Sequence, residues 1–225
     1  MTVTLTFDNG PDPKVTPYVL DVLRERNIRA TFFVLGAKMR ERRLRLIAER
    51  AVAEGHRLGN HTFSHHVQFG LVDPPQQAVL EIQKAQSLIG SLAGEEKLFR
   101  PFGGGGSIDR NLLNDAALAY LRDHQFTVVL WTCVPRDWAE PNRWVDRAMA
   151  CIRAESESVV VLHDLPTGAM RELGSFIDRL ERADRQLVQT FPDTVIAVRG
   201  GVVSDRLEAL LESAPGSAHY SPLSA

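Results

Sequence analysis

Hydrophobic and polar positions alternate along the chain in two patterns, short apolar runs and longer amphipathic stretches. The short runs are rich in β-branched and aromatic residues and predict strands at residues 2–7, 30–35, 126–131, 159–162 and 194–198. The amphipathic stretches place apolar side chains three and four positions apart and predict helices that include residues 18–23, 44–52, 78–92, 112–121 and 173–180. Asp12 and Pro13 match the first residues of the earliest helix. Strands that alternate with helices predict an α/β fold of parallel units, open or closed into a barrel.

The chain has the length of one α/β domain and shows neither an internal repeat nor a linker. We therefore expect one barrel domain over residues 1–204. After Asp205 the sequence has room for one short amphipathic helix, and residues 213–225 are rich in serine, proline and alanine. Residues 205–225 are accordingly predicted to form a C-terminal helix and tail that is partly disordered.

Composition argues against several kinds of partner. The 225 residues carry a formal charge of −2, and the densest group of arginines, at residues 40–45, is interrupted by Glu41 and Leu44, so nucleic acid is not an expected partner. The first strand begins at Thr2, and no apolar run approaches the ~20 residues that cross a bilayer, so we expect no membrane partner and a cytoplasmic location. The two cysteines are interpreted as reduced thiols. The sequence leaves the oligomeric state open.

Polar residues follow the predicted strands, at the end where parallel β/α folds carry their function. Asp8 and Asn9 follow the first strand, where a carboxylate could act as a general base, although Asn9-Gly10 also fits a simple turn. His61 and His65 lie four residues apart, a spacing that on a helical turn places both imidazoles on one face, as in zinc sites. A polar loop without a ligand is the alternative for this pair.

Three more segments carry candidate chemistry. The stretch from Phe99 to Gly106 contains four consecutive glycines, whose backbone can approach a ligand closely and whose N–H groups could stabilise an oxyanion; a flexible loop is the alternative. It is not a phosphate-binding loop, since no Gly-Lys-Ser/Thr follows. Asp137-Trp138 and His163-Asp164 follow two further predicted strands, and neither pair alone would stand out.

Together these segments resemble the polysaccharide deacetylase family, also called the NodB-homology domain or carbohydrate esterase family 4, in order and spacing over roughly residues 3–200. The segments that carry the resemblance are Thr6 to Gly10, His61 to His65, Arg100 to Gly104, Asp137-Trp138 and Val161 to His163. The chain departs from the family pattern at three places. Asn9 stands where the family has a second aspartate, Val134 replaces the first aspartate of the fourth motif, and glycines 103–106 replace a bulky aromatic.

The resemblance implies a distorted (β/α) barrel, similar to a TIM barrel, that hydrolyses an N- or O-acetyl group. By this analogy Asp8 is the general base and His163 the general acid. Arg100, paired with Asp137, would orient Asp8 and keep it ionised. His61, His65 and the residue at position 9 would hold a divalent metal, with zinc the first choice.

The same resemblance implies the residues that would contact substrate. The backbone near Phe102 and Gly103 would form the oxyanion site. Trp138 would line the groove, and Val161 with Leu162 would form the pocket for a small acyl methyl group. The glycines at 103–106 indicate a wider mouth than usual, or a substrate other than a sugar polymer.

Asn9 makes the metal the least secure part of this hypothesis. An amide keeps a carbonyl oxygen but has no charge, so we expect a weakened site, or an enzyme that works without metal. Two alternatives therefore stand beside a deacetylase of acetylated carbohydrate: a metal-independent hydrolase of a small amide or cyclic imide, similar to allantoin, and an inactive carbohydrate-binding relative. The retained acid and base favour an enzyme over the last.

Overall fold

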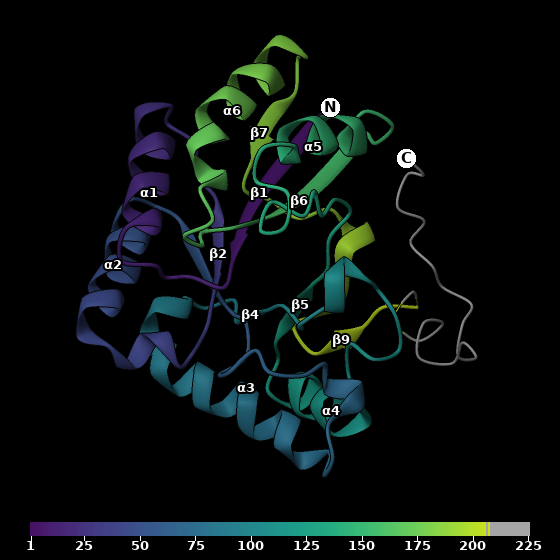
Figure 1. Ribbon diagram of the computed structural model, residues 1–225. Helices are drawn as coiled ribbons and strands as arrows, with labels where there is room; N and C mark the ends of the chain where they lie inside the picture. The colour runs from purple at the N-terminus through teal and green to yellow at the C-terminus, as the bar shows by residue number, and fades with distance from the viewer. Residues whose placement is uncertain (206, 208–225) are drawn as a thin grey trace.

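A computed structural model describes residues 1–205 and 207, which form one curved sheet wrapped by helices (Figure 1). In this part of the chain the sheet has nine strands in the order β6-β1-β2-β3-β4-β5-β8-β9, with β7 beside β1. The strands are β1 (Thr2–Asp8), β2 (Thr31–Val34), β3 (Arg57–Asn60), β4 (Leu98–Phe99), β5 (Thr127–Val129), β6 (Glu157–His163), β7 (Gln186–Val188), β8 (Ile196–Arg199) and β9 (Val202–Val203). The helices are α1 (Val15–Glu25), α2 (Arg42–Ala53), α3 (Gln76–Ile89), α4 (Asp115–Asp123), α5 (Trp144–Ile152) and α6 (Leu173–Arg182).

Strand β1 is the centre of the sheet. It pairs in parallel with β6 along its whole length, and on its other edge it pairs with β7 and then with β2. The register sets Asp8 opposite His163 on one side and opposite Phe33 on the other. Because parallel neighbours end at the same edge, the residues that close β1 and β6 are brought together by backbone pairing alone.

The sheet curls until the segment after β5 reaches β6. Cys133 forms a parallel bridge with Val160, and its backbone N–H donates to the carbonyl of Val159 at 3.1 Å. The strands from β1 to β6 are parallel, whereas β8 is antiparallel to β5. The α/β distorted barrel expected from the sequence is therefore confirmed.

Helices cover the outside of the barrel, with α1, α2, α5 and α6 around β1 and β6, and with α3 and α4 below β4 and β5 in the view of Figure 1. The first helix begins at Val15 rather than at Pro13. The Asp12 carboxylate accepts the backbone N–H groups of Lys14 and Val15 at 2.8 and 2.7 Å, so Asp12 and Pro13 form a turn ahead of the helix.

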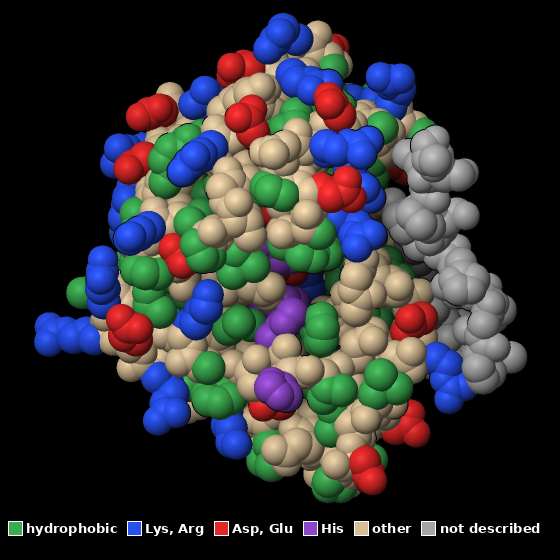
Figure 2. Space-filling model, viewed as in Figure 1, with side chains coloured by type: hydrophobic (Ala, Val, Ile, Leu, Met, Phe, Trp, Pro, Cys, Tyr) green, Lys and Arg blue, Asp and Glu red, His purple; other side chains and the backbone are tan. Residues whose placement is uncertain are grey.

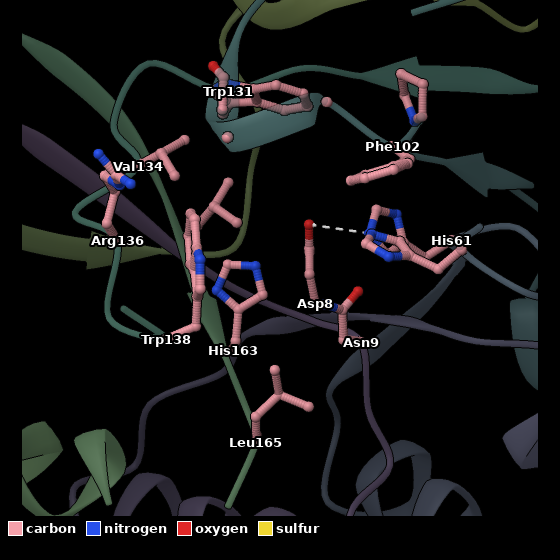
Figure 3. Close-up of a pocket in the computed structure, with 16 residues that line it drawn as sticks. Asp8, Asn9, His61, Phe102, Trp131, Val134, Arg136, Trp138, His163 and Leu165 are labelled. Carbon is pink, nitrogen blue, oxygen red and sulfur yellow. Dashed lines mark hydrogen bonds and ion pairs between the residues drawn. The ribbon is translucent and has the colours of Figure 1, made fainter. Parts of the chain in front are cut away.

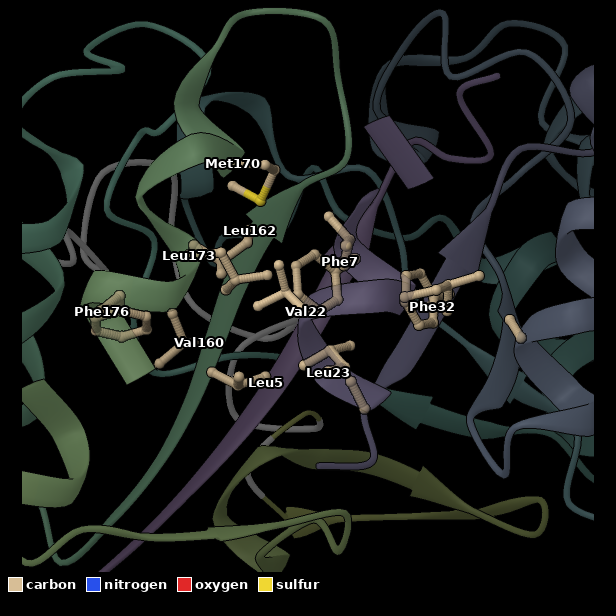
Figure 4. Close-up of a cluster of buried hydrophobic side chains, with 14 of the residues drawn as sticks. Leu5, Phe7, Val22, Leu23, Phe32, Val160, Leu162, Met170, Leu173 and Phe176 are labelled. Carbon is tan, nitrogen blue, oxygen red and sulfur yellow. The ribbon is translucent and has the colours of Figure 1, made fainter. Parts of the chain in front are cut away.

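Side chains of β1 and β6 that point outward pack under the helices (Figure 4). Leu5 and Phe7 from β1 meet Val160 and Leu162 from β6, and all four are fully buried. Each side chain of this kind contributes roughly 1.5–3 kcal/mol by leaving water. The outer core therefore fixes the register of the two strands whose ends carry Asp8 and His163.

Some predictions about single elements were incomplete. The apolar patterns named neither β3 nor β7, because strands of four and three residues are too short for a periodicity to appear. Most of the predicted tail, residues 205–225, lies outside the described residues. Within residues 1–205 and 207, no helix has the length and apolar character needed to cross a membrane.

Candidate active site

A cavity of about 360 Å³ opens where the parallel strands end. Figure 2 shows histidine side chains in a hollow near the centre of this face, and Figure 3 shows Asp8, His61 and His163 directed into it. The residues that line the cavity are Asp8, Asn9, His61, His65, Pro101, Phe102, Gly103, Gly105, Gly106, Trp131, Val134, Arg136, Trp138, Val161, His163 and Leu165. Segments spread over more than 150 positions of the sequence thus meet around one space.

Asp8 is a buried carboxylate held by Arg100. The Arg100 guanidinium donates to Oδ1 of Asp8 at 3.0 Å and to the hydroxyl of Thr6 at 2.6 Å. Arg100 is itself fully buried, and its guanidinium lies 4.0 Å from the ring centroid of Phe33. Burial alone would raise the pKa of Asp8, but the charges of Arg100, His61 and His163 outweigh it and lower that pKa below its ordinary value. Asp8 is therefore ionised at neutral pH.

His163 has the opposite electrostatic environment. Its ring nitrogen Nδ1 lies 2.8 Å from Oδ1 of Asp137, which is completely buried. Burial alone would lower the pKa of His163, but the hydrogen bond to Asp137 and its negative charge raise it above the ordinary value. The ring of Trp138 stands edge-on to the imidazole at 4.6 Å. His163 therefore holds its proton more firmly than a free histidine.

The predicted pair of Arg100 with Asp137 is wrong. Among the described residues Arg100 bonds Asp8, Thr6 and the carbonyl groups of Val129 and Leu130, whereas Asp137 bonds His163. Neither Arg100 nor Asp137 lines the cavity. Each supports one reacting group from beneath, Arg100 the carboxylate and Asp137 the imidazole.

His61 and His65 do not lie on a helical turn, as the sequence hypothesis supposed. They lie in a loop after β3, where Thr62 and His65 have positive φ angles of 69° and 55°. The Asn60 side chain accepts the Thr62 N–H at 3.0 Å, and the Thr62 hydroxyl accepts the His65 N–H at 3.0 Å. This turn brings the two imidazole centroids to 4.8 Å, so the rings are neighbours without a helix.

Both imidazoles are neutral, which a metal ligand requires. Burial lowers the pKa of His61, and it lowers the pKa of His65 to about 3. Nδ1 of His61 lies 2.8 Å from the carbonyl oxygen of Arg100, so it carries the proton and leaves Nε2 with a lone pair, 3.6 Å from Oδ2 of Asp8.

Asn9 lies next to these rings in a left-handed conformation with φ of 72°. Its Oδ1 is buried and has no hydrogen-bond partner in the described part of the chain, a costly state for an amide oxygen. Two neutral imidazoles and one orphaned oxygen are donors that fit a divalent ion. In residues 1–205 and 207 no group of three His, Cys, Asp or Glu side chains forms a metal cluster, because the third donor here is an amide.

Aromatic rings form the upper wall of the cavity in Figure 3. Phe102 packs on His65 with centroids 4.0 Å apart. Trp131 was not identified from the sequence, where it ends an apolar run that predicted only a strand. A Cβ on Gly103 would lie 2.5 Å from the Trp131 ring, and Trp131 Nε1 donates to the Gly106 carbonyl at 2.9 Å. The glycines therefore make room for Trp131, which partly fills the wide mouth expected from the sequence.

Leu162 was predicted to line the acyl pocket, and this is wrong. Successive side chains of a strand point to opposite faces, so Val161 faces the cavity while Leu162 packs in the outer core (Figure 4). The sequence also missed Arg136 and Leu165, which lie in the cavity wall. Their position, one or two residues from Asp137 and His163, is the signal that could have found them.

A carboxylate held ionised and an imidazole held protonated, side by side at the end of a parallel barrel, define a hydrolase that activates water. Comparison with known proteins narrows the class. The model of a family described as polysaccharide deacetylase matches residues 1–129, and the chain belongs to that family.

Named relatives agree with this assignment. The chain is 34% identical over 203 residues to a chitooligosaccharide deacetylase of Sinorhizobium fredii, with 88% of each chain covered. It is 34% identical over 164 residues to a peptidoglycan-N-acetylglucosamine deacetylase of Bacillus cereus, with 72% of each chain covered. A family 4 acetyl xylan esterase from Clostridium thermocellum, solved in complex with a cobalt ion, superimposes with a TM-score of 0.66 at 26% identity and covers 84% of this chain and 88% of its own. The protein is a carbohydrate deacetylase, and the enzyme expected from the sequence motifs is confirmed.

Proposed function

We propose that the chain removes the acetyl group from an N-acetylated sugar, with Asp8 as general base, His163 as general acid and a weakly held zinc ion between His61, His65 and Asn9. The observation that carries the proposal is the pairing of Asp8 with His163 across β1 and β6. It places an ionised base and a protonated acid within one cavity, which is the arrangement that amide hydrolysis at neutral pH needs.

The chain's own residues account for the proton transfers. Asp8 takes a proton from the attacking water, whose oxygen forms a bond to the acetyl carbonyl carbon. Arg100 keeps Asp8 ionised and fixes its orientation through Oδ1, which leaves Oδ2 for the water. His163 gives its proton to the departing nitrogen, so the C–N bond breaks to release acetate and a neutral amine. Asp137 stabilises the charged imidazole before that transfer.

A divalent ion bound by His61, His65 and Asn9 would polarise the water and the attacked carbonyl. All three donors are neutral, so Asp8 is the only anion beside such an ion, and it is already paired with Arg100. The acetyl xylan esterase relative holds cobalt, which supports a metal at this position of the fold. The neutral donor set supports weak binding here.

The substrate inference rests on the cavity and on the relatives. Trp131, Trp138 and Phe102 offer flat apolar faces of the kind that pack against sugar rings. The two relatives above are named for chitooligosaccharide and for peptidoglycan N-acetylglucosamine. An acetylated aminosugar in a short oligosaccharide or a glycan therefore fits this site.

Acetate release tests the proposal. Protein stripped with chelator is incubated with N-acetylated chitopentaose, first alone and then with added zinc or cobalt. We expect acetate to appear, faster with metal, and to fall by roughly 10²–10⁴ in Asp8→Asn and in His163→Ala. Stripped protein that hydrolyses a cyclic imide but no acetylated sugar would overturn the proposal in favour of the metal-free amidase.

A further inference from the structure

A second cavity adjoins the acetyl site. Its volume is about 350 Å³, and it lies between the loop that begins α1 and the loop that follows β6. Leu165 lines both cavities, so the two spaces meet at this side chain. The residues around the second cavity are Lys14, Val15, Tyr18, Leu165, Pro166, Gly168, Met170 and Arg171. None of them belongs to the machinery assigned above.

The charges along both cavities have one sign. Asp8 is the only acid in either lining, and Arg100 already neutralises it. Arg136 in the first cavity and Lys14 and Arg171 in the second are exposed cations, and none has an ion-pair partner within the described residues. The nearest acids, Asp12 and Glu172, lie outside the lining, and Asp12 is occupied by backbone N–H groups.

Arg136 has a further distinguishing feature. Its φ angle is 61°, in the left-handed region that a long side chain seldom adopts. The two residues on either side are fixed, because Asp137 holds His163 and Pro135 is buried. Backbone strain retained at a cavity wall is typical of a residue that serves binding.

Tyr18 adds a surface for a ring. Its side chain is 43% exposed on α1, in an otherwise apolar stretch of the second cavity that includes Leu165 and Met170. An exposed aromatic face beside two cations is suited to a sugar ring that carries an acidic substituent.

We propose that the two cavities form one groove for a glycan that carries carboxylates, with Arg136 on one side of the reacting acetyl group and Lys14, Tyr18 and Arg171 on the other. The inference rests on the proposed function in that the acetyl group occupies the first cavity. It assigns the substrate class: an acidic acetylated glycan is preferred to a neutral one of the same size.

A matched pair of probes tests this preference. The first is a tetrasaccharide of alternating N-acetylglucosamine and N-acetylmuramic acid, and the second is its methyl ester, in which the carboxylates are neutral. Initial rates of acetate release give kcat/KM for each. We expect wild type to favour the acid at low ionic strength and to lose the preference in high salt.

Variants locate the preference. Arg136→Gln, Lys14→Gln and Arg171→Gln should each reduce the ratio of acid to ester by about 2- to 5-fold, and the triple variant by at least about 10-fold. Arg136→Lys should keep most of the preference, and Tyr18→Ala should raise KM for both probes. Arg153→Gln removes an exposed arginine from the loop after α5, at the opposite end of the barrel, and is the matched control.

The outcomes separate this inference from the proposed function. Equal kcat/KM for acid and ester, or a loss in Arg153→Gln as large as in Arg136→Gln, overturns the acidic groove while deacetylation stands. If neither probe is deacetylated, calorimetric titration decides: tighter binding of the acid that disappears in the triple variant supports the groove, and equal binding of both probes overturns it.

Discussion

Asp137 accepts two hydrogen bonds from a single residue, His163. The backbone N–H of His163 donates to Oδ2 at 2.8 Å, and its Nδ1–H donates to Oδ1 at 2.8 Å. One carboxylate thus fixes both the end of β6 and the orientation of the ring that extends from it. Because the carboxylate is buried, its charge acts on the imidazole with little screening.

The pH dependence of catalysis should therefore respond to Asp137. The pKa of His163 is raised in the folded protein, so the imidazole stays protonated as pH rises past its ordinary value of about 6.5. A general acid is lost as pH increases through its own pKa. In Asp137→Asn the pKa of His163 should fall, and the alkaline decline of kcat/KM should begin at lower pH. A pH–rate profile of both proteins measures the shift.

Asp146→Asn is the control for this prediction, because Asp146 pairs with Arg179 on the outer surface. Its profile should match that of wild type. An alkaline limb that stays in place in Asp137→Asn would remove His163 as the acid. The same sign governs stability: the contribution of the pair is full below about pH 6.5 and is lost as pH rises through the folded-state pKa of His163.

The ion pair of Asp8 and Arg100 should matter for stability as well as for activity. Asp8→Asn leaves the Arg100 charge buried without a counter-charge, a change that typically costs about 3–5 kcal/mol. We expect both a fall in kcat of roughly 10²–10⁴ and a clear fall in Tm. Asp146→Asn, which breaks an exposed pair, should shift Tm little. An unchanged Tm in Asp8→Asn would show that Arg100 finds other compensation.

The sequence predicted the main strands and the residues at their ends, and from these the convergence of Asp8, His61 and His163 follows. Parallel pairing explains this success, since register alone brings strand ends together. Side-chain partners were harder to predict. Arg100 and Asp137 follow short strands on the far side of the barrel, and which reaching side chain meets which depends on the curvature of the sheet.

Two other errors have simple physical origins. Leu162 and Val161 are both apolar, and only the alternation of β6, with its known register, decides that Val161 faces the cavity. Trp131 ends an apolar run, so nothing local shows that its ring packs on Gly103 instead of in the core. The turn that joins His61 to His65 depends on the Asn60 side chain, which no four-residue spacing reveals.

Asp164 gives a prediction about folding that is independent of catalysis. The carboxyl group is fully buried; the Thr16 hydroxyl donates to Oδ2, while Oδ1 has no partner within residues 1–205 and 207. Burial raises its pKa to about 6. The protonated form is therefore the stable one, and its contribution is present below about pH 4 and lost as pH rises through about 6.

Replacing Asp164 by Asn should remove this dependence. Relative to Asp164→Asn, wild type should lose on the order of 2–3 kcal/mol of unfolding free energy between pH 4 and pH 8. Urea denaturation of both proteins at several pH values measures the difference. Parallel curves for the two proteins would mean that Asp164 titrates normally. Asp178→Asn, an exposed carboxylate paired with Arg26, provides the comparison.

The metal site is tested most directly at position 9. Oδ1 of Asn9 is the orphaned oxygen beside His61 and His65, and a carboxylate there would add the negative charge that the neutral donors lack. Asn9→Asp should therefore tighten zinc or cobalt binding by at least ~10-fold. Calorimetric titration at neutral pH compares the two proteins, and intact mass excludes prior deamidation of the Asn9-Gly10 pair.

Two further variants complete this test. His61→Ala with His65→Ala should abolish metal binding in either background, whereas His66→Ala, which removes an exposed neighbour in the same loop, should leave it unchanged. Equal affinity in wild type and Asn9→Asp would mean that position 9 is not a ligand and that another group completes the shell. If neither protein binds metal, the two imidazoles serve the substrate directly, because their low pKa values make them neutral hydrogen-bonding groups at the wall of the acetyl site.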